Sequence, residues 1–189
     1  SYCIRLNFVI FEQELTKFPM VTQAFEQALR NWTNELDIES AIFTESGIQF
    51  PFGPSVVSDQ PGMISVHMID VQSAPYNMEE NILGFWLCER SQLYLDSDRL
   101  EADFDLAIHV AMHELGHVFG LPHFSNAGNI YAPTGTIIVP DSVYAKDMVM
   151  FGTCTDENKC AKLSQMEIDI ARNRLFSLGN NCNFHLTRR

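Results

Sequence analysis

Positive charge is scarce in this sequence. It has 12 Lys and Arg against 24 Asp and Glu in 189 residues, which gives a formal net charge of −12. The basic residues form no cluster that could follow a phosphate backbone. Binding to nucleic acid or to an anionic membrane surface depends on such clusters, so we expect neither as a partner.

Long apolar runs are also missing. A stretch without formal charge extends from Val118 to Pro140, but three Pro, three Gly and several polar residues interrupt it. A helix that spans a bilayer needs about 20 predominantly apolar residues, so we expect no membrane span. The sequence starts at Ser1 without a charged-then-apolar leader, and we expect a chain whose targeting segment, if it had one, was removed.

Repeats, low-complexity tracts and Gly/Ser linkers are absent as well, so nothing in the composition divides the chain. A length of 189 residues is typical of one domain. With 46% hydrophobic and 11% aromatic residues, such a domain can bury a core without metal or disulfide support. We predict a single domain over residues 1–189 and a monomer.

Hydrophobic spacing predicts both strands and helices. Three helices are expected: one opened by Pro19, one ending at Phe119 before a Gly and a Pro, and one opened by the capping box from Ser164 to Glu167. Strands are expected at residues 2–8, 40–44, 64–69, 82–87 and 92–95, and a long loop at residues 125–147. This order predicts an α+β fold with a mixed sheet packed on helices.

The second helix carries the motif that points to chemistry. His113, Glu114 and His117 form the pattern His-Glu-x-x-His, which Gly120 and His123 extend to His-Glu-x-x-His-x-x-Gly-x-x-His. Histidines four positions apart lie on one side of a helix, so both imidazoles can reach one metal ion. The chain must turn sharply to deliver the third imidazole, and Gly permits such a turn. The spacing predicts one catalytic Zn²⁺ held by three His, with one position open.

The residue next to the first ligand completes the expected mechanism. Zinc on three neutral imidazoles lowers the pKa of its bound water toward ~7 and polarises a peptide carbonyl. Glu114 would accept the water proton as general base and then pass it to the leaving amine. We therefore expect a zinc-dependent endopeptidase. The alternative left open is a zinc-binding module with restricted or no proteolytic activity.

The zinc motif resembles that of the metzincin metallopeptidases, and further segments resemble the matrixin (matrix metalloproteinase) catalytic domain. Residues 149–152 are similar to the Leu-Met-Tyr-Pro of the matrixin Met-turn, and residues 162–168 to the opening of the matrixin C-terminal helix. The resemblance implies a twisted mixed sheet with an edge strand along the cleft, an active-site helix, and a C-terminal helix after the Met-turn. It also implies an N-terminal subdomain at 1–120 and a C-terminal subdomain at 121–189 with an inserted loop at 125–147.

The resemblance also assigns residues to the cleft. Met150 is preferred over Met148 as the Met-turn residue, although both methionines could simply fill the core. The residues that the resemblance places along a protein or peptide substrate are Gly84, Phe85, Trp86, Phe151 and Gly152. Phe85 and Trp86 could equally be core aromatics. Met166 and Glu167 replace an Asp pair of the matrixins, which puts the family's N-terminal salt bridge in doubt.

Other metal sites receive weaker support. Matrixins bind calcium near the start of the zinc helix, and hard oxygen ligands would suit Ca²⁺ there, but carboxylates at this point also stabilise a helix N-terminus. The acidic residues concerned are Asp96, Asp98, Glu101, Asp103 and Asp105. Only His67 and Asp70 are similar to ligands of the structural zinc of matrixins, so we expect no second zinc. His109, one turn before His113, is expected to have no metal role.

Five cysteines leave at least one unpaired within the chain. Cys154 and Cys160 bracket a polar loop short enough for a local disulfide, and Cys3 could pair with Cys182. Cys88 is then the expected unpaired cysteine, with a thiol near the zinc as its alternative role. Because metzincins mostly act outside the cytosol and disulfides form there, we expect a secreted protein.

Overall fold

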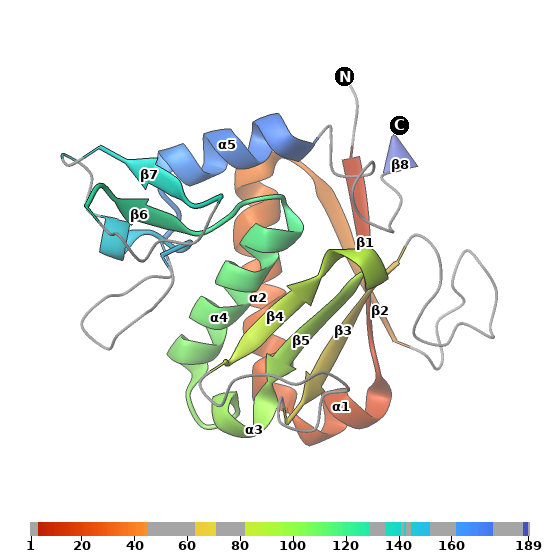
Figure 1. Cartoon of the computed structure of the whole chain (residues 1–189). Helices are drawn as coiled ribbons and strands as arrows, with labels where there is room; N and C mark the ends of the chain where they lie inside the picture. Colours follow the sequence, from red (N-terminus) through yellow and green to blue (C-terminus); the bar gives the residue numbers. More distant parts are fainter. Residues whose placement is uncertain are drawn as a thin grey trace.

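The computed structural model describes residues 4–44, 63–70, 82–128, 135–140, 142, 145–151, 162–175 and 187–188. A sheet occupies one side of the molecule, and the helices α2 and α4 pack along it (Figure 1). The helix α5 and a small second sheet lie beyond the C-terminal end of α4, in the upper part of the view. None of the helices described is both long and apolar enough to cross a membrane.

The main sheet is mixed. Its strand order is β2-β1-β3-β5-β4, and β8 also pairs with β1. All neighbours along this order are parallel except β4 and β5, which are antiparallel. The strands are β1 (Ile4–Ile10), β2 (Glu39–Thr44), β3 (Met63–Ile69), β4 (Gly84–Leu87), β5 (Gln92–Asp96) and β8 (Thr187–Arg188). The predicted α+β fold with a mixed sheet and an edge strand is confirmed, with β4 at the edge.

The core lies between the sheet and α2 (Pro19–Leu36). Successive side chains of a strand point to opposite faces, and Phe8 from the inner face of β1 meets Phe25 of α2 with ring centroids 5.5 Å apart. The apolar positions predicted from helical spacing after Pro19 are all buried. They are Val21, Phe25, Ala28, Leu29, Trp32 and Leu36.

The zinc-motif helix is α4 (Phe104–Val118), one residue shorter at its end than predicted. It begins at Asp103, whose carboxylate accepts a hydrogen bond from the backbone N–H of Leu106 at 3.1 Å, as an N-cap residue does. The indole N–H of Trp32 donates to the backbone oxygen of Met112 at 2.9 Å. This buried bond fixes α4 against α2, so the position of the His-bearing helix is set by the core.

The acidic residues before α4 serve as caps rather than as one cluster. Both carboxylate oxygens of Glu101 accept hydrogen bonds at the start of α2, from the N–H of Met20 at 3.0 Å and of Val21 at 2.9 Å. Asp96 caps the short helix α3 (Ser97–Leu100) and forms an ion pair with Arg99. In the part of the chain described here, no group of three acidic ligands converges. The calcium prediction therefore finds no support.

The segment predicted as a long loop contains ordered elements. β6 (Phe124–Asn126) and β7 (Ile137–Val139) form a parallel two-stranded sheet, and a 3₁₀ turn, η3, covers Ala145–Asp147. The prediction was wrong here because β7 is a β-branched run of only three residues between Gly- and Pro-containing stretches. The helix α1 (Glu12–Lys17) was likewise missed, since it contains one apolar residue, Leu15, and therefore shows no recurrence of apolar positions. The last helix is α5 (Gln165–Leu175), as the capping box predicted.

Cys88 corrects the expected cysteine pairing. It lies in the 3₁₀ turn η2 (Cys88–Arg90) after β4, and it is disulfide-bonded. The prediction that Cys88 is unpaired, or a thiol near the zinc, is therefore wrong. The other four cysteines lie outside the described residues, as do the pairings predicted for them, Cys154–Cys160 and Cys3–Cys182.

Candidate metal centre

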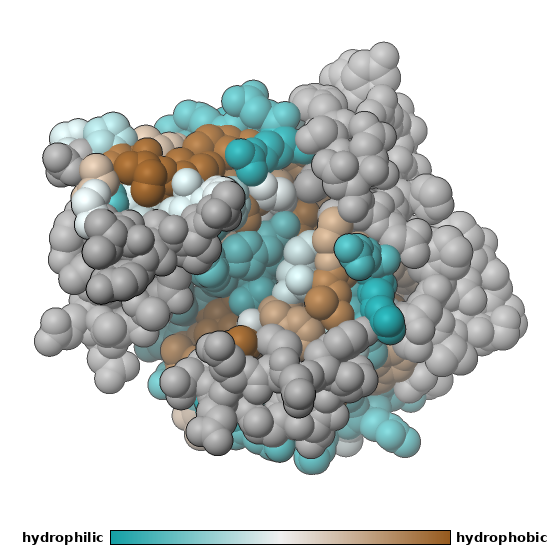
Figure 2. Space-filling view, in the orientation of Figure 1, coloured by the Kyte–Doolittle hydropathy of each residue, from teal (hydrophilic) through white to brown (hydrophobic). Residues whose placement is uncertain are grey.

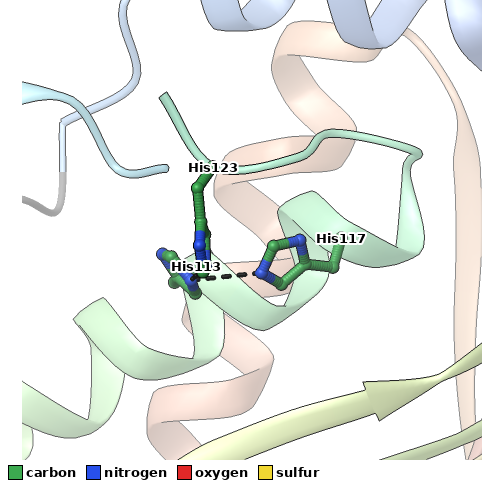
Figure 3. A group of neighbouring side chains, drawn as sticks. All are labelled: His113, His117 and His123. Carbon is green, nitrogen blue, oxygen red and sulfur yellow. Dashed lines mark hydrogen bonds between the residues drawn. The ribbon is translucent and has the colours of Figure 1, made fainter. Parts of the chain in front are cut away.

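Three imidazoles converge at the end of α4. His113 and His117 lie one turn apart on the helix, and His123 approaches from the segment that follows (Figure 3). The Nε2 atom of His113 lies 3.0 Å from Nε2 of His123 and 3.2 Å from Nε2 of His117. Among the described residues, these three form the group whose ligand atoms lie close enough together to hold a metal ion.

Backbone carbonyls fix which nitrogen of each helix imidazole faces inward. The oxygen of Val149 lies 2.8 Å from Nδ1 of His113, and the oxygen of Leu121 lies 2.7 Å from Nδ1 of His117. A carbonyl only accepts a hydrogen bond, so each Nδ1 carries the hydrogen and each Nε2 of the neutral ring presents a lone pair. Lone pairs that face one another at this distance repel unless a cation lies among them.

The spacing of these lone pairs fits zinc. Two ligands on a tetrahedral ion with Zn–N bonds of ~2.0–2.1 Å are about 3.3–3.4 Å apart, close to the separations of the inward nitrogens. Burial lowers the pKa of His113 to about 3 and the pKa of His117 to about 4. It also lowers the pKa of His123. All three rings are therefore neutral near pH 7, which is the state that ligates a metal.

A glycine turn delivers His123 to the site. The N–H of Leu121 donates to the oxygen of Gly116 at 2.9 Å, and the N–H of Gly120 donates to the oxygen of His117 at 3.0 Å. These two bonds, with Gly120 at φ 90°, are those of a Schellman motif. A side chain at position 120 would be strained at this φ. The sharp turn expected from the sequence is therefore present, and it reverses the chain toward the helix.

Met150 lies beneath the histidine-bearing turn of α4. It is fully buried, and a β-carbon added to Gly116 would lie only 2.2 Å from its sulfur. The backbone oxygen of Met150 accepts from the N–H of Phe124 at 2.9 Å, next to the third histidine. Met148 is buried as well. The segment 148–151 thus contacts the site through a side chain and through two carbonyl oxygens.

Glu167 holds this segment in place. Its carboxylate accepts from the N–H of Met150 at 2.8 Å, the N–H of Val149 at 3.3 Å, and both the N–H and the hydroxyl of Ser164, at 3.1 and 2.9 Å. Burial raises the pKa of Glu167, although these bonds act in the opposite direction. The sequence predicted the capping box with Ser164 but not the bonds to Val149 and Met150. The peptide group between Val149 and Met150 links Glu167 to His113, because its N–H donates to Glu167 and its oxygen accepts from Nδ1 of His113.

Replacing Glu167 with Gln is expected to lower the free energy of unfolding by roughly 1–3 kcal/mol. The amide NH₂ would face backbone N–H donors, which leaves buried donors without acceptors. Thermal or urea unfolding of the metal-free protein measures the loss. Asp169→Asn is the matched control, since Asp169 lies on the same helix with its side chain 57% exposed, and we expect a change within about 0.5 kcal/mol. Equal stability of Glu167→Gln and wild type would contradict the role given to this carboxylate.

Glu114 belongs to α4, and its side chain lies toward the edge strand β4. It is 6% exposed, and burial raises its pKa to about 8. The Cγ atom of Glu114 is 3.0 Å from the place where a β-carbon on Gly84 would stand. The predicted base and the first residue of β4 are therefore in contact, as expected for a catalytic helix beside an edge strand. In the orientation of Figure 1, Figure 2 shows hydrophilic residues in a hollow at the centre of this face, with hydrophobic residues along its sides.

The other residues predicted for the cleft differ in their surroundings. The ring of Phe85 stacks on Tyr94 at 4.6 Å, and Trp86 packs against the main core, so both side chains take part in packing. Phe151 is partly buried and bridges to Phe124. Gly152 lies outside the described residues. The ring of His109 is buried, 6.2 Å from the ring of His113.

Comparison with known proteins identifies the family. The family model of the matrixins matches residues 4–147, which include the strands β1 to β5, the helix α4 and the three histidines. A search of curated proteins finds no match. The match covers most of the chain, and the fold and the histidine geometry described above agree with it. The chain belongs to the matrixin family.

Proposed function

We propose that this protein is a zinc-dependent endopeptidase, with His113, His117 and His123 as the ligands of one catalytic Zn²⁺. The observation that carries the proposal is the convergence of three Nε2 atoms, two of which present lone pairs because the Nδ1 atoms of their rings donate to backbone carbonyls. Metallopeptidases of the matrixin family use this chemistry. Bound zinc would supply a Lewis acid that polarises the scissile carbonyl and acidifies water.

Glu114 is proposed as the general base. Its carboxylate is buried beside His113, and in the described part of the chain no donor reaches its Oε2 atom. A carboxyl group in such surroundings binds a proton readily and releases it again, as burial raises its pKa to about 8. In the reaction, Glu114 would accept a proton from the attacking water and donate it to the amine that leaves. Met150 is proposed as the Met-turn residue that supports the site from below.

The substrate is proposed to be an extended peptide bound along β4. This strand ends the order of the main sheet, and among the described residues no strand pairs with its outer edge. A peptide can add to such an edge through backbone N–H and C=O groups, which Gly84, Phe85 and Trp86 would supply. Phe151 and Gly152 are proposed to border the pocket on the other side. The cleft then separates subdomains 1–120 and 121–189, and secretion of a disulfide-bonded monomer fits a peptidase of this family.

Removal of zinc is expected to abolish cleavage of a casein or peptide-library substrate, and addition of one equivalent of Zn²⁺ should restore it. The physical reason is that three neutral imidazoles bind the ion but do not themselves polarise a carbonyl. Saturating zinc should also stabilise the folded protein, by about 2.7 kcal/mol at a free concentration of 100 times Kd. Activity assays and thermal unfolding with and without 1,10-phenanthroline measure both effects.

Two variants make this test specific. His117→Ala should lose zinc and activity together, whereas His67→Ala, which removes an imidazole from the sheet, should keep wild-type zinc content. Zinc binding without any cleavage would refute the peptidase proposal. Cleavage that persists after complete zinc removal would refute the role of the metal.

A further inference from the structure

No polar group among the described residues holds the free end of Glu114. Its Oε2 atom is buried without a hydrogen-bond partner there. By contrast, Glu167, the other buried glutamate near the site, accepts four hydrogen bonds. The direction of the Glu114 carboxylate therefore depends on the atoms that pack around its methylene groups.

Gly84 forms the wall on one side of these methylene groups. A β-carbon on Gly84 would lie 3.0 Å from Cγ of Glu114, 3.0 Å from the backbone oxygen of Tyr94 and 3.2 Å from Cγ1 of Val110. Carbon atoms pack best at about 3.5–4.0 Å. A β-carbon here would therefore be crowded by α4 and by the neighbouring strand β5, and these neighbours would have to shift by a few tenths of an ångström to admit it.

The strand cannot move away easily to make room. Gly84 pairs with Leu95 in the antiparallel ladder, and the N–H of Asp96 donates to the oxygen of Leu83 at 2.8 Å. The φ angle of Gly84 is not among the positive values found for the described glycines. The need for glycine at this position is therefore spatial, and alanine could adopt the same backbone conformation.

We infer that Gly84 is a positioning residue for Glu114: its missing side chain lets the edge strand pack directly on the glutamate and fixes the direction of the carboxylate. The inference rests on the proposed function, in which Glu114 is the base. It is separate from substrate pairing along β4, because pairing uses the backbone N–H and C=O, which alanine retains. A side chain at position 84 would displace the side chain of Glu114 and leave the three histidines in place.

The test is Gly84→Ala in the zinc-loaded protein. We expect kcat to fall by roughly 3- to 10-fold, because misplacement of a catalytic group by about 1 Å costs about 10²-fold and a shift of a few tenths of an ångström relieves the crowding here. KM and zinc content should stay near wild type. A fall confined to KM would show a role in substrate binding instead and would overturn the inference, as would unchanged kcat. Val110→Ala removes both γ-methyl groups of Val110, including Cγ1, which faces the crowded space. The double variant Gly84→Ala/Val110→Ala should therefore recover kcat relative to Gly84→Ala, and lack of recovery would contradict the steric explanation.

A second readout does not depend on activity. In the metal-free protein with ¹³C-labelled glutamate, the carboxyl resonance of Glu114 can be assigned by its loss in Glu114→Gln. Gly84→Ala should shift this resonance and leave that of Glu167 unchanged. An unmoved Glu114 resonance would overturn the inference whether or not the protein is a peptidase. Wild-type protein that binds zinc but cleaves nothing would refute the proposed function alone, and the resonance would still report whether Gly84 positions Glu114.

Discussion

Glu114→Gln is expected to lower kcat/KM by about 10²–10⁴-fold, the usual contribution of general acid–base catalysis. The amide keeps the size and burial of the side chain but cannot take up a proton from the attacking water. Zinc content should stay at wild-type level, because the proposed ligands are the three histidines. Steady-state kinetics on a quenched peptide substrate, together with metal analysis of the same sample, measure both quantities.

The burial of Glu114 makes this variant informative. Glu114 is 6% exposed, and burial raises the pKa of its carboxyl group to about 8, so replacement by a neutral amide removes no ionic interaction that supports the fold. We therefore expect the metal-free variant to be at least as stable as wild type near neutral pH. Asp105→Asn is the matched control on the same helix, because Asp105 is exposed in the first turn of α4. Retention of more than a tenth of wild-type activity by Glu114→Gln would reject Glu114 as the base.

Local pattern was enough to predict most of the secondary structure. The amphipathic spacing after Pro19 predicted α2 because every member of the stripe is buried in the core. Ser164 with Glu167 predicted the start of α5, because a capping box is a contact between near neighbours. The convergence of the three histidines of the candidate metal centre could be predicted for the same reason. Their spacing depends on helix geometry and on one glycine turn.

Contacts between distant parts of the chain could not be predicted in this way. The bonds from Val149 and Met150 to Glu167 join segments whose approach depends on the course of residues 124–151. The disulfide of Cys88 is another such contact. Cys88 was predicted to be unpaired because the other four cysteines could form two pairs, and no distance between sulfur atoms supported those pairs. Gly84 was predicted to lie along the substrate. Its closeness to Glu114 depends on the packing of β4 beside α4, which the sequence pattern does not reveal. In each case the missing information was which segments pack together.

Gly116→Ala is expected to destabilise the protein and weaken zinc binding together. In an ordinary helix, alanine in place of glycine stabilises by up to ~1 kcal/mol. Here the added carbon would stand 2.2 Å from the sulfur of Met150, 3.1 Å from its methyl carbon and 3.3 Å from Cζ2 of Trp32. All of these atoms are buried, and overpacking of this kind costs typically 1–3 kcal/mol. Thermal unfolding of the metal-free protein should show a lower midpoint.

The effect on zinc follows from the position of Met150 in the chain. Its neighbour Val149 supplies the carbonyl that orients His113 at 2.8 Å, so a displaced Met150 shifts that carbonyl. Loss of an outer partner of a ligand typically costs 10- to 100-fold in metal affinity, which competition with a chromogenic chelator would measure. Met150→Ala opens the space that the alanine needs, so the double variant Gly116→Ala/Met150→Ala should lose less stability than the two single losses added together. Strict additivity would mean that Gly116 and Met150 do not oppose each other across this contact, and the support of the metal site from below would have to come from another residue.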